Sequence, residues 1–195
     1  MSRPHSFTLH NQTVYFASSE DLSFLGSPKA TLVVTSPPYW NLKDYGHPKQ
    51  IGPSSYKEYL ERLNVVWGQC YNIAADSAVM VVNIGNRRHK KRYYPIGLDI
   101  ANAIHGWVLW DILIWNVPNA LPQPCHYMER LFDNKYEFLL IFTKDGSTDY
   151  KCHKPRVPQK YLHADPRTHK RNKRGRCLGN VIRIPAYRPP NVKKL

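Results

Sequence analysis

A group of residues able to bind a flat polar ring follows an apolar run early in the chain. Ser36-Pro37-Pro38-Tyr39-Trp40 offers a hydroxyl, two backbone carbonyls and two aromatic rings. The carbonyls can accept hydrogen bonds from an amino group of the ring, while an aromatic side chain can stack on its face. These residue types therefore predict a site for an aromatic ring that carries an exocyclic amine.

The run before this group, Thr31–Thr35, is apolar and β-branched, which is typical of a buried strand. Pro37 and Pro38 end the strand because they have no N–H with which to continue its hydrogen bonds. Open α/β sheets bind ligands at the carboxyl ends of their strands. The position of the group thus favours a functional site. The alternative is a strand that ends in a proline-rich turn and has no functional role.

Strands and helices alternate along the rest of the chain. Ser55 and Glu58 form a capping box that predicts a helix, and Pro95 begins a second helix that Gly106 is expected to end. Apolar or alternating runs predict further strands over 12–16, 78–84, 107–115 and 136–142. This order predicts an α/β fold with a parallel or mostly parallel sheet covered on both faces. The basic run Arg87–Arg92 is expected to be an exposed loop.

Length and composition favour one intracellular globular domain. The 195 residues suffice for a single core, and 42% of them are hydrophobic. No apolar run is long enough to span a bilayer and no signal sequence begins the chain, so we expect a cytoplasmic, nucleoid-associated protein. The four cysteines have no zinc-finger spacing, and we expect no metal. Four tryptophans are expected in the core: Trp67, Trp107, Trp110 and Trp115.

Positive charge is concentrated at the C-terminal end. Residues 1–149 hold 14 basic and 13 acidic side chains, whereas residues 150–195 hold 14 basic side chains and one acidic one. We therefore expect a catalytic part over 1–149 and a basic, largely irregular segment over 150–195 that contacts DNA. A solvated basic tail is the alternative. The predicted contacts to the DNA backbone are Arg87, Arg88, Lys90, Lys91, Lys170, Arg171, Lys173, Arg174 and Arg176.

Three segments resemble, in order, the motifs of the DNA amino-methyltransferases. Ser36-Pro37-Pro38-Tyr39 resembles the catalytic motif in the form most typical of the N4-cytosine enzymes. The segments over 111–122 and 136–144, the latter preceded by Arg130, are similar to the later strands of the family, although Val117 stands where lysine is common. This order is that of the permuted group, in which the catalytic half precedes the cofactor half. The resemblance implies part of a Rossmann-like methyltransferase sheet.

The resemblance also implies roles for individual residues. Ser36, Pro37, Pro38 and Tyr39 would be catalytic: Ser36 and the Pro37 carbonyl would accept hydrogen bonds from the amine, and Tyr39 would stack on a base flipped out of the duplex. The residues implied to bind the substrate are Trp40, Asp44, Tyr45, Asn119 and Arg130. Ordinary loop packing is the alternative for Trp40, Asp44 and Tyr45, and satisfying backbone groups is the alternative for Asn119 and Arg130.

One motif of the family is missing from the sequence. A Phe-x-Gly-x-Gly strand should follow in the permuted order and hold S-adenosylmethionine, but neither Phe24-Leu25-Gly26 nor Asn83-Ile84-Gly85 has the required glycines. We therefore expect an incomplete cofactor site and a second polypeptide that carries this half. The expected function is methyl transfer from S-adenosylmethionine to cytosine N4 in double-stranded DNA within a restriction-modification system. The alternatives are an N6-adenine enzyme and a non-catalytic, basic DNA-binding remnant.

Overall fold

The computed structural model describes residues 4–26, 30–122, 130–158 and 175–187. The chain divides into two compact units, each of which is built from two segments. The first unit comprises residues 1–112 and 138–150, and the second comprises residues 113–137 and 151–195. No helix in the described ranges is long and apolar enough to cross a membrane.

Five strands form a mixed sheet in the order β11-β7-β8-β4-β3. Their bounds are Ala30–Thr35 for β3, Ala74–Ile84 for β4, Trp107–Asn116 for β7, Tyr136–Lys144 for β8 and Val181–Arg183 for β11. β3 is parallel to β4, but β4 is antiparallel to β8. The expectation of a mostly parallel sheet is therefore wrong in this respect. A short apolar run such as Tyr136–Phe142 identifies a strand but carries no information about its direction.

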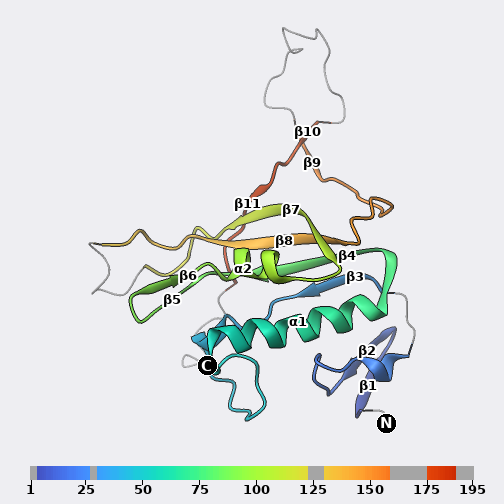
Figure 1. The fold of residues 1–195 in the computed structure, drawn as a ribbon. Coiled ribbons are helices and arrows are strands. Elements are labelled where there is room, and N and C mark those ends of the chain that lie inside the picture. The colour runs from blue at the N-terminus through green and yellow to red at the C-terminus, as the bar shows by residue number, and fades with distance from the viewer. Residues whose placement is uncertain (1–3, 27–29, 123–129, 159–174, 188–195) are drawn as a thin grey trace, which may run out of the picture. The chain divides into compact units, whose positions relative to one another are not determined.

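Two helices cover one face of the first unit's strands. Helix α1 spans Tyr56–Ile73 and runs along β3 and β4 (Figure 1), while α2 spans Ile96–Ala103. The capping box is confirmed, because Ser55 Oγ accepts a hydrogen bond from Glu58 N at 3.2 Å. α2 ends at Ala103 and not at Gly106, and Gly106 has a positive φ and lies against the ring of Tyr71. The glycine therefore shapes the turn into β7.

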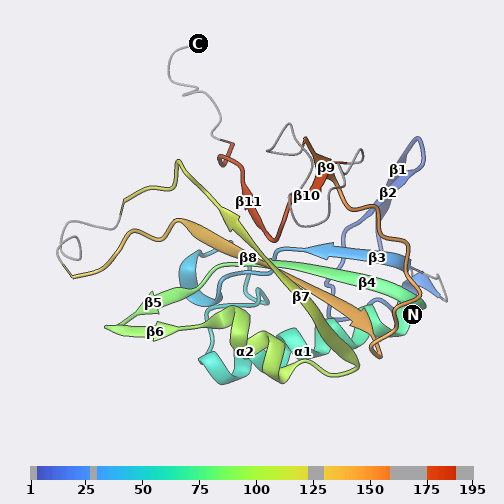
Figure 2. The same ribbon diagram turned by 90° about the horizontal axis from the view of Figure 1, so that it is seen from above.

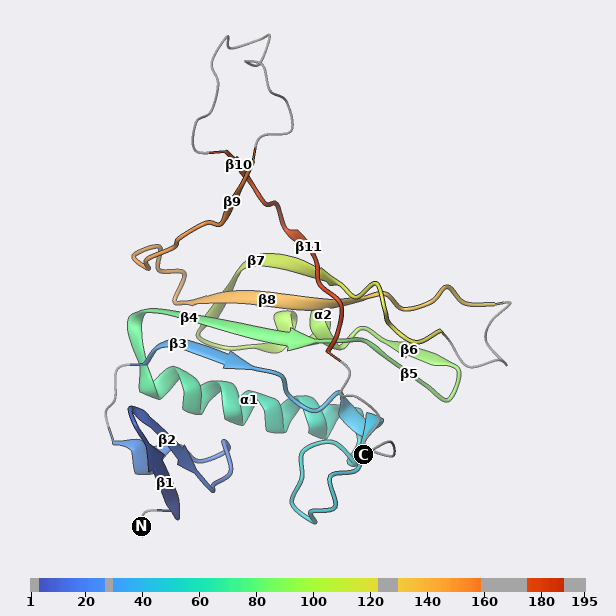
Figure 3. The same ribbon diagram turned by 180° about the vertical axis from the view of Figure 1, so that it is seen from behind.

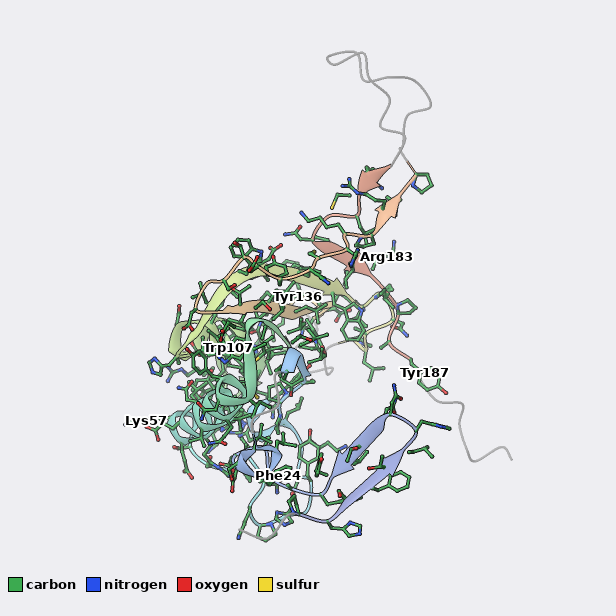
Figure 4. All side chains as sticks on the ribbon, turned by 90° about the vertical axis from the view of Figure 1, so that its right-hand side faces the viewer. Phe24, Lys57, Trp107, Tyr136, Arg183 and Tyr187 are labelled. Atoms are coloured by element: carbon green, nitrogen blue, oxygen red, sulfur yellow. The ribbon has the colours of Figure 1, made fainter. Side chains whose placement is uncertain are left out.

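The core lies between these helices and the sheet. It includes Met80, Val82 and Ile84 of β4, Leu140 and Phe142 of β8, and the inward faces of α1 and α2. Trp67 and Trp107 belong to it as predicted, and Figure 4 shows Trp107 among closely packed side chains. Trp110, in contrast, is 49% exposed, so its assignment to the core is wrong. It lies in the exposed part of β7, where the residues of a hydrophobic run are not buried.

The opposite face of the first unit's strands is apolar but open. Leu32 and Val34 of β3 are 58% and 69% exposed, and they pair in register with the half-buried Val79 and Val81 of β4. β3 is also an edge strand of the sheet. The prediction of a strand buried in a sheet covered on both faces is therefore wrong for β3, because both helices of the described ranges pack on the same side.

Two hairpins, one further pair of antiparallel strands and two 3-10 turns complete the described structure. The hairpins join Ser6–Leu9 (β1) to Gln12–Tyr15 (β2) and Arg87–His89 (β5) to Arg92–Tyr94 (β6), and the further pair is Arg156–Val157 (β9) with Arg176–Cys177 (β10). The 3-10 turns span Ser23–Leu25 (η1) and Trp40–Leu42 (η2). The basic run Arg87–Arg92 is thus not an irregular loop but most of the β5–β6 hairpin, which projects beyond the carboxyl end of β4 (Figures 2 and 3).

Candidate active site

The candidate site lies where the parallel strands β3 and β4 end side by side. Thr35 pairs in register with Val82, so Ser36 leaves the sheet next to the last residues of β4. Ser36 is exposed, Pro37 is buried and Tyr39 is half-buried against the core. The hydroxyl is therefore presented to solvent by a segment whose next residue is fixed in place.

Helix α1 holds this segment through a buried tyrosine. Tyr59 is fully buried, and its hydroxyl donates a hydrogen bond to the Pro38 carbonyl at 2.7 Å. Burial raises the pKa of Tyr59 above its ordinary range, so the hydroxyl remains a donor. This bond uses one of the two lone pairs of the Pro38 carbonyl oxygen, whereas Tyr59 does not engage the Pro37 carbonyl, which the motif can offer to an amine. Sequence reasoning missed Tyr59, which read only as part of the apolar face of a helix.

Trp40 acts as the second anchor of the motif. Its φ of 51° is in the left-handed region, which is unusual for a bulky residue, and its indole Nε1 donates to the Ser54 carbonyl at 2.9 Å. The ring makes edge or tilted contacts with Tyr56, His89 and Tyr94, at centroid distances of 4.7 to 5.2 Å. Trp40 is only 6% exposed. It therefore packs inside the protein and orders the loop, and its contact with a substrate base stays a prediction.

Gly52 allows this arrangement. A Cβ at residue 52 would lie 2.7 Å from the Trp40 carbonyl, and the φ of Gly52 is 144°. A side chain is therefore excluded at this position by the backbone itself. The close approach joins the start of the loop to the segment that leads into α1.

The loop after the motif is organised by its own polar groups. Asp44 Oδ1 accepts hydrogen bonds from Gln50 Nε2 at 2.6 Å and from Gly46 N at 2.8 Å, which lower the pKa of Asp44. Tyr45 is 56% exposed, and Lys43 Nζ lies 5.3 Å from the centre of its ring. Both predicted substrate residues are thus on an exposed loop beside the motif, and their contact with a base remains a prediction.

The residues after β4 add two polar groups: Arg87, a predicted contact to the DNA backbone, and Asn86, which sequence reasoning did not assign to the site. Arg87 Nε donates to Asn41 Oδ1 at 3.3 Å, which ties the β5–β6 hairpin to the residue after Trp40. Asn86 Oδ1 is buried and has no hydrogen-bond partner among the described residues. A buried acceptor without a partner is costly, and such groups are frequent at functional sites. The available signal was the polar strand end Asn83–Asn86.

The remaining predicted residues belong to the second unit or lie outside the described ranges. Asn119 exchanges two hydrogen bonds of 2.8 Å with the backbone of Ala186, so its amide satisfies backbone groups, and a role toward DNA remains a prediction. Arg130 and Arg176 are exposed. Lys170, Arg171, Lys173 and Arg174 fall outside the described residues.

The glycines of the sequence bear on the predicted cofactor site. No Phe-x-Gly-x-Gly occurs in the sequence. Gly85, at the end of β4, has no second glycine beside it, and a glycine-lined turn is what allows a backbone to approach a nucleoside closely. That the described residues hold only part of the site for S-adenosylmethionine stays a prediction. The described residues contain no cluster of three or more potential metal ligands.

Comparison with known proteins relates the chain to one family. Residues 30–195 match the DNA methylase family of the N6/N4 type. Two relatives are the type II methyltransferase M.MwoI of Methanothermobacter wolfeii, 35% identical over 128 residues, and the type II methyltransferase M.XycI of Xanthomonas campestris pv. cyanopsidis, 29% identical over 189 residues. The matches cover 62% and 80% of this chain, but only 19% and 62% of the relatives.

The fold has a counterpart among solved structures. The PvuII DNA methyltransferase, described as cytosine-N4-specific, superimposes with a TM-score of 0.60 over 91% of this chain and 58% of that chain. The two sequences are 16% identical over the match, so the similarity is one of fold. The fold described above, with its five-stranded sheet, therefore matches the fold of a methyltransferase over most of the chain.

Proposed function

This chain belongs to the DNA methylase family of the N6/N4 type, and from that membership we propose that it forms the base-binding half of an enzyme that methylates the N4 amine of cytosine in DNA. The observation that carries the proposal is the geometry of Ser36–Tyr39. Ser36 is exposed at the carboxyl end of β3, and the Tyr59 hydroxyl donates to the Pro38 carbonyl. An amine would meet the Ser36 hydroxyl and the Pro37 carbonyl as acceptors.

The chemistry requires such acceptors because the exocyclic amine of cytosine is a poor nucleophile. Its lone pair is conjugated with the ring, so hydrogen bonds from the amine to Ser36 and to the Pro37 carbonyl would fix the orientation of the nitrogen. When bound, S-adenosylmethionine supplies the methyl group. Tyr39 would stack on the base, which must leave the duplex to reach the site. The serine at position 36 and the fold of the cytosine-N4-specific PvuII enzyme both favour cytosine over adenine.

We propose that the cofactor half is contributed by protein outside these 195 residues, on a second polypeptide. β3 ends the sheet at one edge, and Leu32 and Val34 are exposed on it. An apolar strand with an unpaired edge is a template for another strand. A segment with the Phe-x-Gly-x-Gly motif could pair there and complete both the sheet and the cofactor site.

The substrate would be double-stranded DNA, held in part by the basic segment over 150–195. Its 14 basic side chains against one acidic side chain favour a polyanion. Deletion of residues 170–176 is expected to weaken binding to every DNA sequence and to reduce the dependence of affinity on salt. An unchanged slope would remove this segment from the interface.

Reconstitution is the experiment that tests the proposed function. Isothermal titration of the chain alone with S-adenosylmethionine is expected to give no binding, whereas addition of a polypeptide with the Phe-x-Gly-x-Gly motif should restore cofactor binding and methyl transfer to duplex DNA together. Mass analysis of the nucleosides should then identify N4-methylcytosine. Tight stoichiometric binding by the chain alone would contradict the division between two polypeptides.

Two other outcomes would change the assignment of function. N6-methyladenine as the product would retain the enzyme class but replace the base. DNA binding without methyl transfer under any reconstitution would favour the non-catalytic basic protein. The variants Ser36→Ala and Tyr39→Ala are expected to lose activity in the reconstituted enzyme, and full activity in both would overturn the choice of catalytic residues.

A further inference from the structure

The β5–β6 hairpin has an unusual tip. His89 and Arg92 pair in register, so Lys90 and Lys91 form a two-residue turn, and both have positive φ values, 47° and 65°. Such a turn strongly prefers Asn-Gly, because a side chain with a long stem is disfavoured in the left-handed region. Two adjacent lysines therefore occupy the positions that tolerate them least.

The hairpin is also strongly and uniformly charged. The residues 87–94 contain three arginines, two lysines and a histidine, with no acidic residue. Arg88 and Arg92 lie over the rings of Tyr93 and Tyr94, at 5.4 Å and 5.3 Å from the ring centres. Within the described ranges, no ion pair involves any of these cations. Their charges are thus available to an anionic partner.

The base of the hairpin is fastened to the candidate active site. Arg87 donates to Asn41, while His89 and Tyr94 both contact the ring of Trp40. Residues rise about 3.3 Å each along a strand, so the turn lies about 10 Å beyond the Arg87–Asn41 contact. The phosphates of one DNA strand rise about 3.4 Å each along the helix axis, so a hairpin that runs along this axis would reach about three nucleotides past its anchor.

We propose that the Lys90–Lys91 tip binds backbone phosphates of the duplex that flank the target base, and that the contacts at Trp40 and Asn41 set its distance from Ser36. This inference rests on the proposed function for the identity of the anion as DNA. Strain at the tip is tolerated because the lysines serve binding. The rigid anchoring makes the hairpin a register arm: a phosphate held at its tip fixes which nucleotide faces the motif.

The test measures two quantities that the same substitution should change in opposite directions, thermal stability and affinity for DNA. In the 195-residue chain, replacement of Lys90-Lys91 by Asn-Gly is expected to raise the melting temperature by a few degrees, because the turn then has its preferred residues. The same change should lower the affinity for duplex DNA of any sequence and reduce the slope of log affinity against log salt by about 2, one for each phosphate contact. A variant that gains stability and keeps the wild-type slope would overturn the proposal.

Three further variants separate charge from conformation. Lys90→Gln with Lys91→Gln removes the charge and retains long side chains, and it should reduce the slope as Asn-Gly does even if that variant fails to fold. Lys90→Arg with Lys91→Arg should bind as the wild type. Lys57→Gln is the remote control: this side chain is 87% exposed on α1 (Figure 4), and its removal should leave the slope unchanged.

Binding is measured in the Ser36→Ala background without cofactor, so that it does not depend on methyl transfer. If changing the tip weakens DNA binding but the reconstituted protein shows no methyl transfer, the hairpin contact is supported and the proposed reaction is not. Methyl transfer that is insensitive to the tip, with unchanged salt dependence, would leave the reaction standing and remove the hairpin from the interface.

Discussion

Two hydrogen bonds and the packing of the Trp40 ring define the geometry of the Ser36–Trp40 segment. Tyr59 engages the Pro38 carbonyl from α1, and Trp40 is held by the Ser54 carbonyl and by aromatic neighbours. These contacts come from residues 14 to 54 positions away along the chain. The tetrapeptide can therefore be read from the sequence, but the groups that orient it cannot, because only the fold brings them together.

Tyr59→Phe is expected to slow methyl transfer without weakening DNA binding. The change removes one hydroxyl and leaves the Pro38 carbonyl without its donor, which costs about 1–3 kcal/mol. The Pro37–Pro38 segment would then sample other orientations, and kcat should fall about tenfold, equivalent to about 1.4 kcal/mol. Steady-state kinetics of the reconstituted enzyme, with KM for DNA measured separately, checks this prediction.

Tyr71→Phe provides the matched control for this variant. Tyr71 lies on the same helix, twelve residues further along or about 18 Å away, and its hydroxyl donates to Asp145 Oδ2 at 2.6 Å. Its loss should reduce stability slightly and leave kcat unchanged. If both variants lose stability and neither loses rate, the Tyr59 hydroxyl has no role in positioning the motif.

Tyr39→Ala is expected to reduce kcat/KM through the loss of a stacking contact. The ring is half-buried, and base stacking on an aromatic side chain is worth about 1–3 kcal/mol. Tyr39→Phe keeps the stacking face and should keep most of the activity. Comparison of the two variants in the reconstituted enzyme is the measurement, and equal activities of the alanine and phenylalanine variants would exclude stacking at this position.

Secondary structure elements differ in how far the sequence determines them. Helix α1 was predictable from its capping box and its apolar spacing, and β4, β7 and β8 from their apolar runs. The β5–β6 hairpin was not, because its strands are basic and have no apolar alternation, and its turn lacks the expected Asn-Gly. The antiparallel direction of β8 depends on the order of strands in space, which no local pattern records.

The loop after the motif is fixed from a neighbouring element by Arg62 of α1. Its guanidinium donates to Glu20 through Nε and Nη2, at 2.9 and 2.7 Å, and to the carbonyls of Gln50 and Lys49, both at 2.8 Å. One side chain thus links residues 18–22, the helix and the loop. Sequence inspection gave no reason to pair Glu20 with Arg62, which are 42 positions apart.

Glu20→Gln is expected to lower stability near neutral pH and to have little effect in acid. The hydrogen bond from Arg62 lowers the pKa of Glu20 below its ordinary value of 4.5. The stabilisation is therefore complete above that ordinary value and is lost as the pH falls through the lowered pKa of the folded state. For this partly exposed pair, a contribution of about 1 kcal/mol is expected.

Urea unfolding of the wild type and of Glu20→Gln at several pH values between 7 and 3 measures this difference. The gap between the two proteins should close as the pH falls below about 4.5. Glu61→Gln is the control, since its ion pair with Lys57 is on the surface and should contribute little at any pH. A gap that is constant with pH would show that Glu20 acts through packing and not through its charge.

For the chain as a whole, the concentrated positive charge and the exposed apolar pair of β3 lie on different segments. Positive charge is concentrated over 150–195, and the exposed apolar pair on β3 belongs to the other unit. The family motifs identify β3 as a strand of the sheet, but its place at the edge follows only from the order of the strands in space. The same motifs could not predict that both helices pack on one face, which depends on the lengths and directions of their connections.

The double variant Leu32→Lys with Val34→Lys is expected to keep the stability of the chain and to lose its assembly with other polypeptides. Both side chains lie on the open face of the edge strand and are more than half exposed, so the double variant should retain its melting temperature. Two charges on an exposed strand edge oppose pairing with another strand. Sedimentation velocity should therefore show less self-association of the variant than of the wild type. Addition of a polypeptide with the Phe-x-Gly-x-Gly motif should no longer restore cofactor binding.

The control for this variant is Val65→Lys with Leu98→Lys, which places two lysines at exposed apolar positions of α1 and α2. Because these positions are on the helices and away from the strand edge, the control should associate and reconstitute as the wild type does. If the β3 variant reconstitutes fully, the edge is not where the cofactor half binds. If both double variants block reconstitution equally, added charge alone is the cause. A specific pairing of strands would be blocked only by the change on β3 and not by the change on the outer faces of the helices.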